Sequence, residues 1–190
     1  SCSVLSEACI PPEWCTAGSM PQDPAPESSI PCPTWRCTMQ AMLDSGAPYP
    51  SQYFAREDPS DDRQFYDWPR KVVHIDESAI NALRATYDDL LPASGMLLDL
   101  MSAWRSHLPS RFTRSPDVEV VGLGMNADEM ADNYQLSRFI VHDLNQTPSL
   151  PFADGAFDSA VCAVSVQYLT QPVAVFEEVA RVLKPGALFV

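Results

Sequence analysis

The amino-acid sequence predicts an α/β fold built on a doubly wound parallel sheet, and two observations support this. First, short continuous apolar runs of strand length recur along the second half of the chain, as expected for strands buried on both faces. Second, these runs alternate with short loops and helical segments, which join parallel strands through right-handed crossovers. The expected strands are residues 96–100, 118–123, 139–141, 159–164 and 187–190.

Three helices are predicted around these strands. Apolar residues recur at helical spacing between Ala79 and Leu91, with Asp76 as the N-cap and Pro92 ending the helix. Two further helices are expected after the second and fourth strands. They cover residues 127–134 and 172–183, and Lys184-Pro185-Gly186 is expected to end the last one before the fifth strand.

The N-terminal part of the chain differs in composition from the rest. Residues 1–50 form a leader rich in proline and cysteine, which we predict to be mostly disordered. Its cysteines show no spacing typical of a zinc site, so we interpret them as unpaired thiols, with disulfides or a metal as alternatives. No metal site is predicted. The leader cysteines are Cys2, Cys9, Cys15, Cys32 and Cys37.

Residues 51–75, called here the aromatic segment, separate the leader from the domain predicted over residues 76–190. The segment combines a dense group of aromatic residues with several aspartates. Two interpretations are open. The aromatic side chains pack the segment onto the domain, or the segment forms a lid or wall over a ligand pocket.

The charge of the chain excludes some classes of partner. The formal net charge is −13 and no basic stripe is present, so binding to nucleic acid or to an anionic membrane surface is not expected. No apolar run reaches the roughly 18 residues of a membrane span, and no secretory signal is visible. We therefore expect a cytoplasmic or plastid protein. Because the first residue is Ser1, we expect a processed chain or a fragment.

Three motifs together resemble the class I S-adenosylmethionine-dependent methyltransferases of the small-molecule type. They are the first strand with its acid (Met96–Leu100), Pro-Phe-x-Asp-x-x-Phe-Asp at 151–158, and Arg-Val-Leu-Lys-Pro-Gly-Ala at 181–187. The resemblance covers about residues 75–190, and the last two motifs are the most specific. Shorter stretches resemble an uncharacterised branch of this family from algae, plants and bacteria. These stretches are residues 98–109, 124–126 and 143–146.

The resemblance implies a Rossmann-like sheet, S-adenosyl-L-methionine as cofactor and a small-molecule methyl acceptor. It also implies two further strands after Val190, so we expect strands one to five here and a domain that is incomplete at its C-terminus. A domain that ended there would leave an open apolar sheet edge, which favours aggregation, and we would expect no turnover from it. The sequence carries no signal for an oligomeric state.

Under this resemblance, the methionine end of the cofactor lies over Asp99, Met101, Ser102 and Ala103. The family has Gly-x-Gly-x-Gly in this loop, whereas Met101, Ala103 and Arg105 stand at the glycine positions. A left-handed conformation costs a non-glycine residue about 1–2 kcal/mol. We therefore expect the loop to take another path, and a fold that has lost cofactor binding is the alternative.

Two other cofactor contacts follow from the resemblance. The family's ribose-binding acid aligns with Gly124, which has no side chain, and Asn126 is the expected neutral partner in its place. Asp143 and Leu144 are expected to meet the amino group and the ring of the adenine.

No catalytic triad is visible, and methyl transfer from a sulfonium depends mainly on alignment and on exclusion of water. The catalytic residue stays unassigned, with Tyr168 as the expected acceptor contact and His107 and His142 as further candidate bases. The competing function is a non-catalytic module that binds a nucleoside-type ligand or a protein partner. A nicotinamide dehydrogenase is disfavoured because the first turn lacks the glycines that a pyrophosphate requires.

Overall fold

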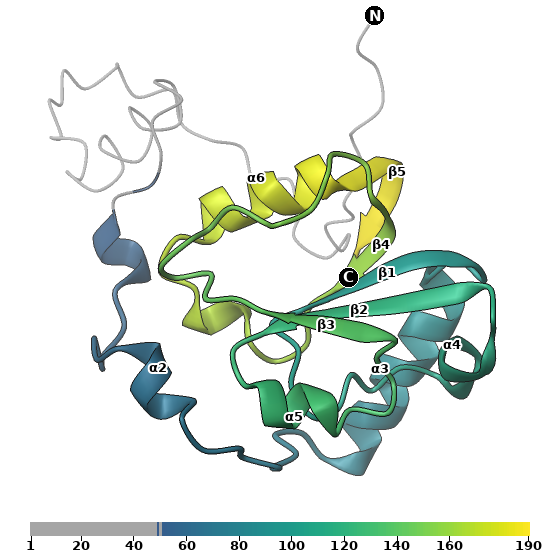
Figure 1. Ribbon diagram of the computed structural model, residues 1–190, viewed down its shortest axis with the longest axis horizontal. Helices are drawn as coiled ribbons and strands as arrows, with labels where there is room; N and C mark the ends of the chain where they lie inside the picture. The colour runs from purple at the N-terminus through teal and green to yellow at the C-terminus, as the bar shows by residue number, and fades with distance from the viewer. Residues whose placement is uncertain (1–48, 50) are drawn as a thin grey trace, which may run out of the picture. The chain divides into compact units, whose positions relative to one another are not determined.

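The computed structural model describes residue 49 and residues 51–190 (Figure 1). The predictions for the leader and its cysteines lie outside these residues. Five parallel strands form one sheet in the order β3-β2-β1-β4-β5, which confirms the predicted Rossmann-like doubly wound sheet. The strands are β1 Gly95–Leu100, β2 Val118–Gly124, β3 Arg138–Val141, β4 Phe157–Val161 and β5 Leu183–Phe189.

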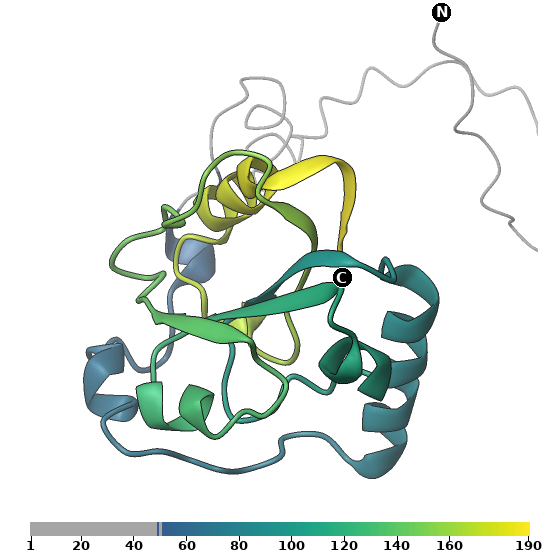
Figure 2. The ribbon, with the colours of Figure 1, turned by 45° about the vertical axis from the view of Figure 1, so that its right-hand side comes forward.

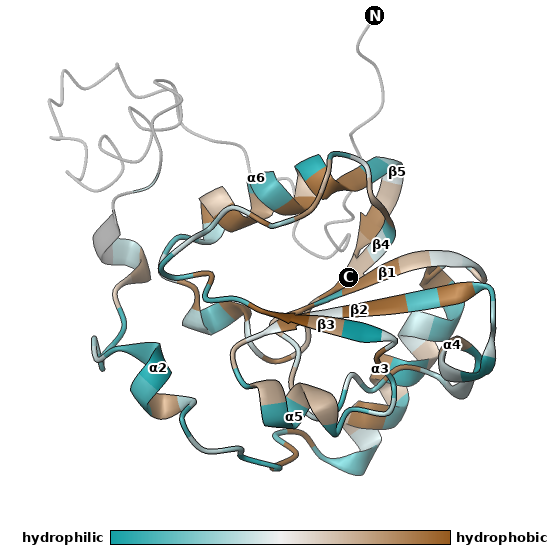
Figure 3. Ribbon diagram, viewed as in Figure 1, coloured by the Kyte–Doolittle hydropathy of each residue, from teal (hydrophilic) through white to brown (hydrophobic). Residues whose placement is uncertain are grey.

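Helices cover both faces of this sheet (Figures 1 and 2). On one face, α6 (Pro172–Val182) packs through its valines against alternate residues of the central strands, including Leu98 and Leu100. On the other face, α3 (Glu77–Leu90) and α4 (Ser110–Arg114) pack against the strand residues that point the opposite way, such as Leu97. The strands therefore bury apolar side chains on both faces. Figure 3 shows that β2 is largely hydrophobic apart from one hydrophilic stretch.

The helix before the sheet has the predicted start. Asp76 lies just outside α3 and its side chain accepts a hydrogen bond from Ala79 N at 2.8 Å, which is the geometry of an N-cap. Two short elements precede α3 in the aromatic segment, namely η2 (Ser51–Phe54) and α2 (Asp62–Phe65). Among the described residues, no helix combines the length and the apolar character needed to cross a membrane.

Two elements end earlier than the sequence predicts, and one helix was not predicted. Helix α5 (Ala127–Ala131) ends before residue 134, because the chain turns at Asp132 and the Asn133 side chain bonds to the loop after β1. Strand β4 ends at Val161 instead of residue 164, because its partner β1 has already turned away after Leu100. Helix α4 was not predicted, because five residues are too few to show a helical period.

The fifth strand begins earlier than predicted. Lys184-Pro185-Gly186 does follow the end of α6, but the three residues lie inside β5 as an irregularity. The pairing steps from Phe157 with Leu183 to Ser159 with Leu188, so the extra residues of β5 bulge out of the ladder. Gly186 adopts a φ of +83°, which glycine accommodates without strain.

Candidate functional site

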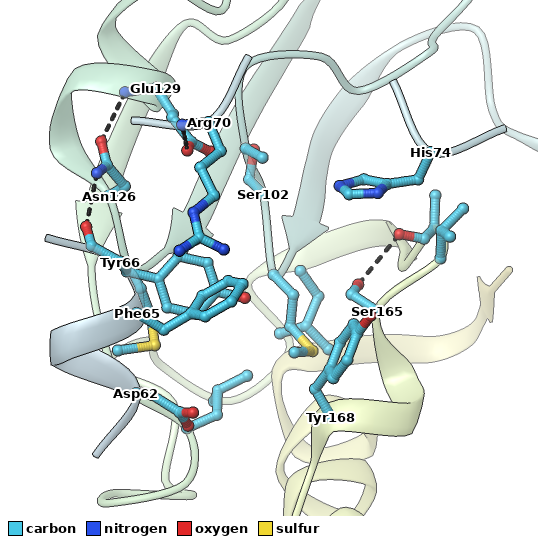
Figure 4. Close-up of a pocket in the computed structure, with 18 of the residues that line it drawn as sticks. Asp62, Phe65, Tyr66, Arg70, His74, Ser102, Asn126, Glu129, Ser165 and Tyr168 are labelled. Atoms are coloured by element: carbon cyan, nitrogen blue, oxygen red, sulfur yellow. Dashed lines mark hydrogen bonds between the residues drawn. The ribbon is translucent and has the colours of Figure 1, made fainter. Parts of the chain in front are cut away.

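A cavity of about 680 Å³ lies at the carboxyl ends of the parallel strands. In doubly wound sheets this edge is the usual place for a ligand, and the volume falls in the range of about 300–1,000 Å³ found for small-molecule sites. Its walls come from the aromatic segment, the loop after β1, the turn after β2, and the segments after β3 and β4. Figure 4 shows part of this lining.

The aromatic segment forms one wall of the cavity and is attached mainly by polar contacts. Asn126 Nδ2 donates to Tyr66 O at 2.7 Å, and Arg70 N donates to Glu129 Oε1 at 2.5 Å (Figure 4). Further along the segment, Trp104 Nε1 donates to Val72 O at 3.0 Å.

A second group of polar contacts holds the other end of the aromatic segment. Asp62 pairs with Arg56 and accepts a hydrogen bond from Asn145 Nδ2 at 2.8 Å. By contrast, Trp68 is 77% exposed and Phe65 is 49% exposed. The structure thus places this segment as a cavity wall, in which Trp68 and Phe65 contribute little to its attachment to the domain.

The loop after β1 follows an unusual path at its first residue. Met101 adopts a left-handed φ of +56°, although Ala103 and Arg105, at the other two expected glycine positions, do not. Ser102 N then donates to Leu123 O at 2.8 Å, so the loop crosses the end of β2. We expected none of the three residues at the glycine positions to adopt a left-handed conformation. This holds for Ala103 and Arg105 but not for Met101.

This crossing explains why position 124 has no side chain. A Cβ built on Gly124 would lie 2.0 Å from the carbonyl oxygen of Ser102, far inside van der Waals contact. No acid can occupy this position while the loop keeps its path. The path of the glycine-free loop after β1 therefore explains why no ribose-binding acid stands at position 124.

A buried carboxylate anchors the loop. Asp99 is 5% exposed, and its Oδ2 accepts hydrogen bonds from Ser102 Oγ at 2.6 Å and from Ser106 Oγ at 2.5 Å. Burial raises the pKa of Asp99 to about 6, and the two hydroxyl donors oppose that shift. Asp99 reaches the edge of the cavity, but its hydrogen bonds hold the loop.

Two amide side chains from the turn after α5 add hydrogen bonds to the same loop. Asn133 Nδ2 donates to Ala103 O at 2.8 Å and to Ser106 Oγ at 2.9 Å. Gln135 accepts from Ser106 N at 3.2 Å and donates to Leu108 O at 2.8 Å. Ser106, Asn133 and Gln135 are not predictable from the sequence as site residues, because no periodic or motif signal links residues so far apart in the chain.

Asn126, the expected ribose partner, makes two hydrogen bonds within the protein. Its Oδ1 accepts from Glu129 N at 2.9 Å as the N-cap of α5, and its Nδ2 donates to Tyr66 O. Both polar atoms of the side chain are thus engaged with the protein, although the residue lines the cavity.

Asp143 and Leu144 lie together at the cavity, as expected. Asp143 Oδ1 accepts from Asn145 N at 3.0 Å and Gln146 N at 3.1 Å, which fixes the turn after β3. Its Oδ2 has no hydrogen bond within residues 51–190. Leu144 is 5% exposed and supplies an apolar surface beside the carboxylate.

The candidate bases also line the cavity. Tyr168 is the last residue of η3 (Val166–Tyr168). It is half exposed and faces the cavity shown in Figure 4. Burial, with smaller contributions from Arg84 and Arg105, lowers the pKa of His107. His142 Nε2 lies 2.8 Å from Thr147 O, and His74, which was not predicted as a site residue, also lines the cavity. No metal-binding cluster of His, Cys, Asp and Glu occurs in the part of the chain that the structure describes.

Comparisons with known proteins find a family match over part of the chain. Residues 111–190 match the family described as "Methyltransferase domain". A stretch of 68 residues is 34% identical to the biotin biosynthesis bifunctional protein BioHC of Teredinibacter turnerae, and it covers 36% of this chain and 12% of that protein.

Similar solved structures include a putative methyltransferase of Bacillus halodurans, with 21% identity and a TM-score of 0.44 over 58% of this chain and 48% of that one. Another is the [4+2]-cyclase SpnF, with 24% identity and a TM-score of 0.49 over 64% and 48% of the two chains. The chain thus spans about half of the length of these structures and a small part of the curated relative.

Proposed function

We propose that this chain, whose residues 111–190 match the methyltransferase-domain family, binds S-adenosylmethionine in the cavity and transfers its methyl group to a small-molecule acceptor. The observation that carries the proposal is the position of the cavity. It lies at the carboxyl ends of β1, β2, β3 and β4, and the residues expected to hold the cofactor line it. These residues are Asp99, Met101, Ser102, Ala103, Asn126, Asp143 and Leu144.

The adenine end has suitable residues in this cavity. Asp143 Oδ2 is available to accept a hydrogen bond from an exocyclic amino group, and the apolar surface of Leu144 suits the ring. At the ribose, the carbonyl oxygen of Ser102 occupies the place beside Gly124 where the resemblance would put the side chain of a ribose-binding acid. We assign the role of ribose hydroxyl acceptor to this carbonyl.

The bound cofactor supplies a methyl group that its sulfonium already makes electrophilic. The chain then has to orient the acceptor and exclude water, which is where most of the acceleration of such a reaction arises. The aromatic segment provides the wall, and Tyr168 is the residue we assign to acceptor contact. Burial lowers the pKa of His107 and so favours its neutral form, which can accept a proton from the acceptor.

The test is calorimetric and thermal-shift titration with S-adenosylmethionine and with S-adenosylhomocysteine. We expect both to bind, and we expect Asp143→Asn to weaken binding by about tenfold, because an amide NH₂ cannot accept from the adenine. Asp117→Asn is the matched control, since Asp117 is exposed and outside the cavity. A folded sample that binds neither compound would overturn the proposal.

The competing function is a non-catalytic module with the same fold. The observation in its favour is the closed position at Gly124, which leaves the ribose without an acid. The family match favours the enzyme. The two are separated by adding candidate acceptors to the cofactor complex, since a module binds the cofactor and releases no demethylated product.

A further inference from the structure

Most charged side chains around the cavity are already engaged by the protein. Arg56 pairs with Asp62. The guanidinium of Arg105 donates to Trp104 O at 2.6 Å and lies over the Trp104 ring. Arg70 differs from both. Its backbone N–H donates to Glu129, but within residues 51–190 no carboxylate or carbonyl accepts a hydrogen bond from its guanidinium.

Three of the carboxylates at the cavity are engaged in a similar way, whereas Asp143 keeps one free oxygen and forms no ion pair with Arg70 within residues 51–190. Asp99 accepts from two serine hydroxyls, Asp62 from Arg56 and Asn145, and Glu129 from the backbone of Arg70. The positive charge of Arg70 is therefore not neutralised by an ion pair with any of these acids, although the chain as a whole is strongly acidic.

The guanidinium of Arg70 is nevertheless held in place. Its carbon lies 3.5 Å from the centroid of the Phe65 ring, and the backbone of the same residue is fixed 2.5 Å from the buried Glu129 carboxylate. Figure 4 shows the side chain running from Glu129 towards Phe65 at the cavity. A guanidinium over a ring keeps its N–H donors in its own plane, where they remain free for a ligand.

We propose that Arg70 is the anion-recognition residue of this cavity, and that its guanidinium binds a carboxylate or phosphate group of the ligand while Phe65 supports it from below. A planar guanidinium matches such groups through two parallel hydrogen bonds. The inference rests on the proposed function and deepens it. The anion comes either from the amino-acid end of the cofactor or from the methyl acceptor.

The first arm of the experiment tests the cofactor as the source. Calorimetry compares S-adenosylhomocysteine with its decarboxylated analogue on the wild-type chain, on Arg70→Gln, and on the control Arg114→Gln, an exposed arginine outside the cavity. If the cofactor carboxylate binds Arg70, Arg70→Gln weakens S-adenosylhomocysteine by about tenfold or more and leaves the analogue unchanged. The backbone bond to Glu129 survives the substitution, so the variant should fold.

The second arm tests the acceptor as the source. Inorganic phosphate and acetate are titrated while the arginine Nε–H resonances are followed by NMR, with the Arg70 signal assigned by its loss in Arg70→Gln. If Arg70→Gln leaves the affinity for S-adenosylhomocysteine unchanged, and the Arg70 signal of the wild type shifts saturably with phosphate or acetate, the anion belongs to the methyl acceptor. If neither arm depends on Arg70, the inference is overturned. If the wild type binds no S-adenosylhomocysteine but its Arg70 signal still shifts, the anion site stands and the proposed function fails.

Discussion

Asp99 shows how one buried side chain can substitute for backbone freedom. In a glycine-rich loop the chain turns without strain, whereas here Met101 adopts a left-handed conformation that costs about 1–2 kcal/mol. The hydrogen bonds from Ser102 and Ser106 to Asp99, each to a carboxylate and worth about 1.5–3 kcal/mol, are of the size needed to offset that strain. The loop is therefore held by side chains where the glycine-rich motif of the family that the sequence resembles would provide backbone freedom.

Replacing Asp99 with asparagine should remove a pH dependence of stability. The pKa of Asp99 is raised from 3.8 to about 6 on folding, so between these values the folded protein holds a proton that the unfolded chain releases. The free energy of unfolding should thus fall as the pH rises from about 4 to about 6, by about 3 kcal/mol. Urea unfolding of wild type and Asp99→Asn across this range measures the difference, and parallel curves for the two proteins would contradict it.

Gly124→Ala should destabilise the loop after β1 more than its small size suggests. The new Cβ would meet the Ser102 carbonyl at 2.0 Å, so either β2 or the loop has to move, at about 1–3 kcal/mol. Gly155→Ala is the comparison variant: open space surrounds Gly155 outside the cavity, so its substitution costs only the backbone strain of a φ of +61°, about 1–2 kcal/mol, and causes no clash. Denaturant unfolding measures both costs, and S-adenosylhomocysteine titration should separate the variants, because only Gly124→Ala disturbs the cavity. Equal stability and equal affinity would refute this account of Gly124.

At the scale of elements, the aromatic segment depends on the first turn of α5. The Asn126 side chain both caps this helix and donates to Tyr66 O, and Glu129 within it accepts from Arg70 N. A five-residue helix contributes little stability by itself. Its structural role here is to present these two side chains to the segment that walls the cavity.

Asn126→Asp should loosen the aromatic segment while leaving α5 capped. A carboxylate still accepts from Glu129 N, but it has no donor for Tyr66 O and repels that carbonyl. We expect trypsin to cleave the segment, for example after Arg63, about five- to tenfold faster, with less than about 1 kcal/mol lost from global unfolding. Asn81→Asp, on the exposed side of α3, makes the same charge change without touching the segment. Cleavage at the same rate in both variants would show that the contact to Tyr66 does not hold it.

The elements that could be predicted are those whose signal is local. The valines of α6 recur at helical spacing over eleven residues, and β1 and β2 are continuous apolar runs, so both kinds were located within about a residue. Helix α4 is too short to show a period. The bulge in β5 depends on pairing with β4, which is a property of the sheet and not of the Lys184-Pro185-Gly186 sequence.

The candidate site was predictable in its position but not in its contacts. Asp143 and Leu144 follow a strand directly, so the edge on which they lie is set by the sheet. Asn133 and Gln135 reach the loop after β1 from a turn 27 residues and more away along the chain, and nothing in their own neighbourhood marks them. The same is true of Asn126, whose side chain meets a residue 60 positions earlier.

At the scale of the whole molecule, one ligand site touches parts of the chain that are far apart in sequence. The cavity is walled by the aromatic segment, the loop after β1 and the turn after β3, and these parts contact one another through single polar bonds such as Asn145 to Asp62. A ligand that bridges the three should therefore stabilise them together, and its effect should decrease towards the opposite end of the strands.

Hydrogen–deuterium exchange with and without S-adenosylhomocysteine measures this coupling. At 100 times its Kd, a ligand stabilises the folded state by about 2.7 kcal/mol, so amides that exchange through global unfolding should slow by about a hundredfold. Locally opening amides in residues 51–75, 101–106 and 143–147 should be protected as well. Those around Gly95, at the opposite end of β1, should not gain local protection. Protection restricted to one of the three segments would mean that the ligand does not span the cavity.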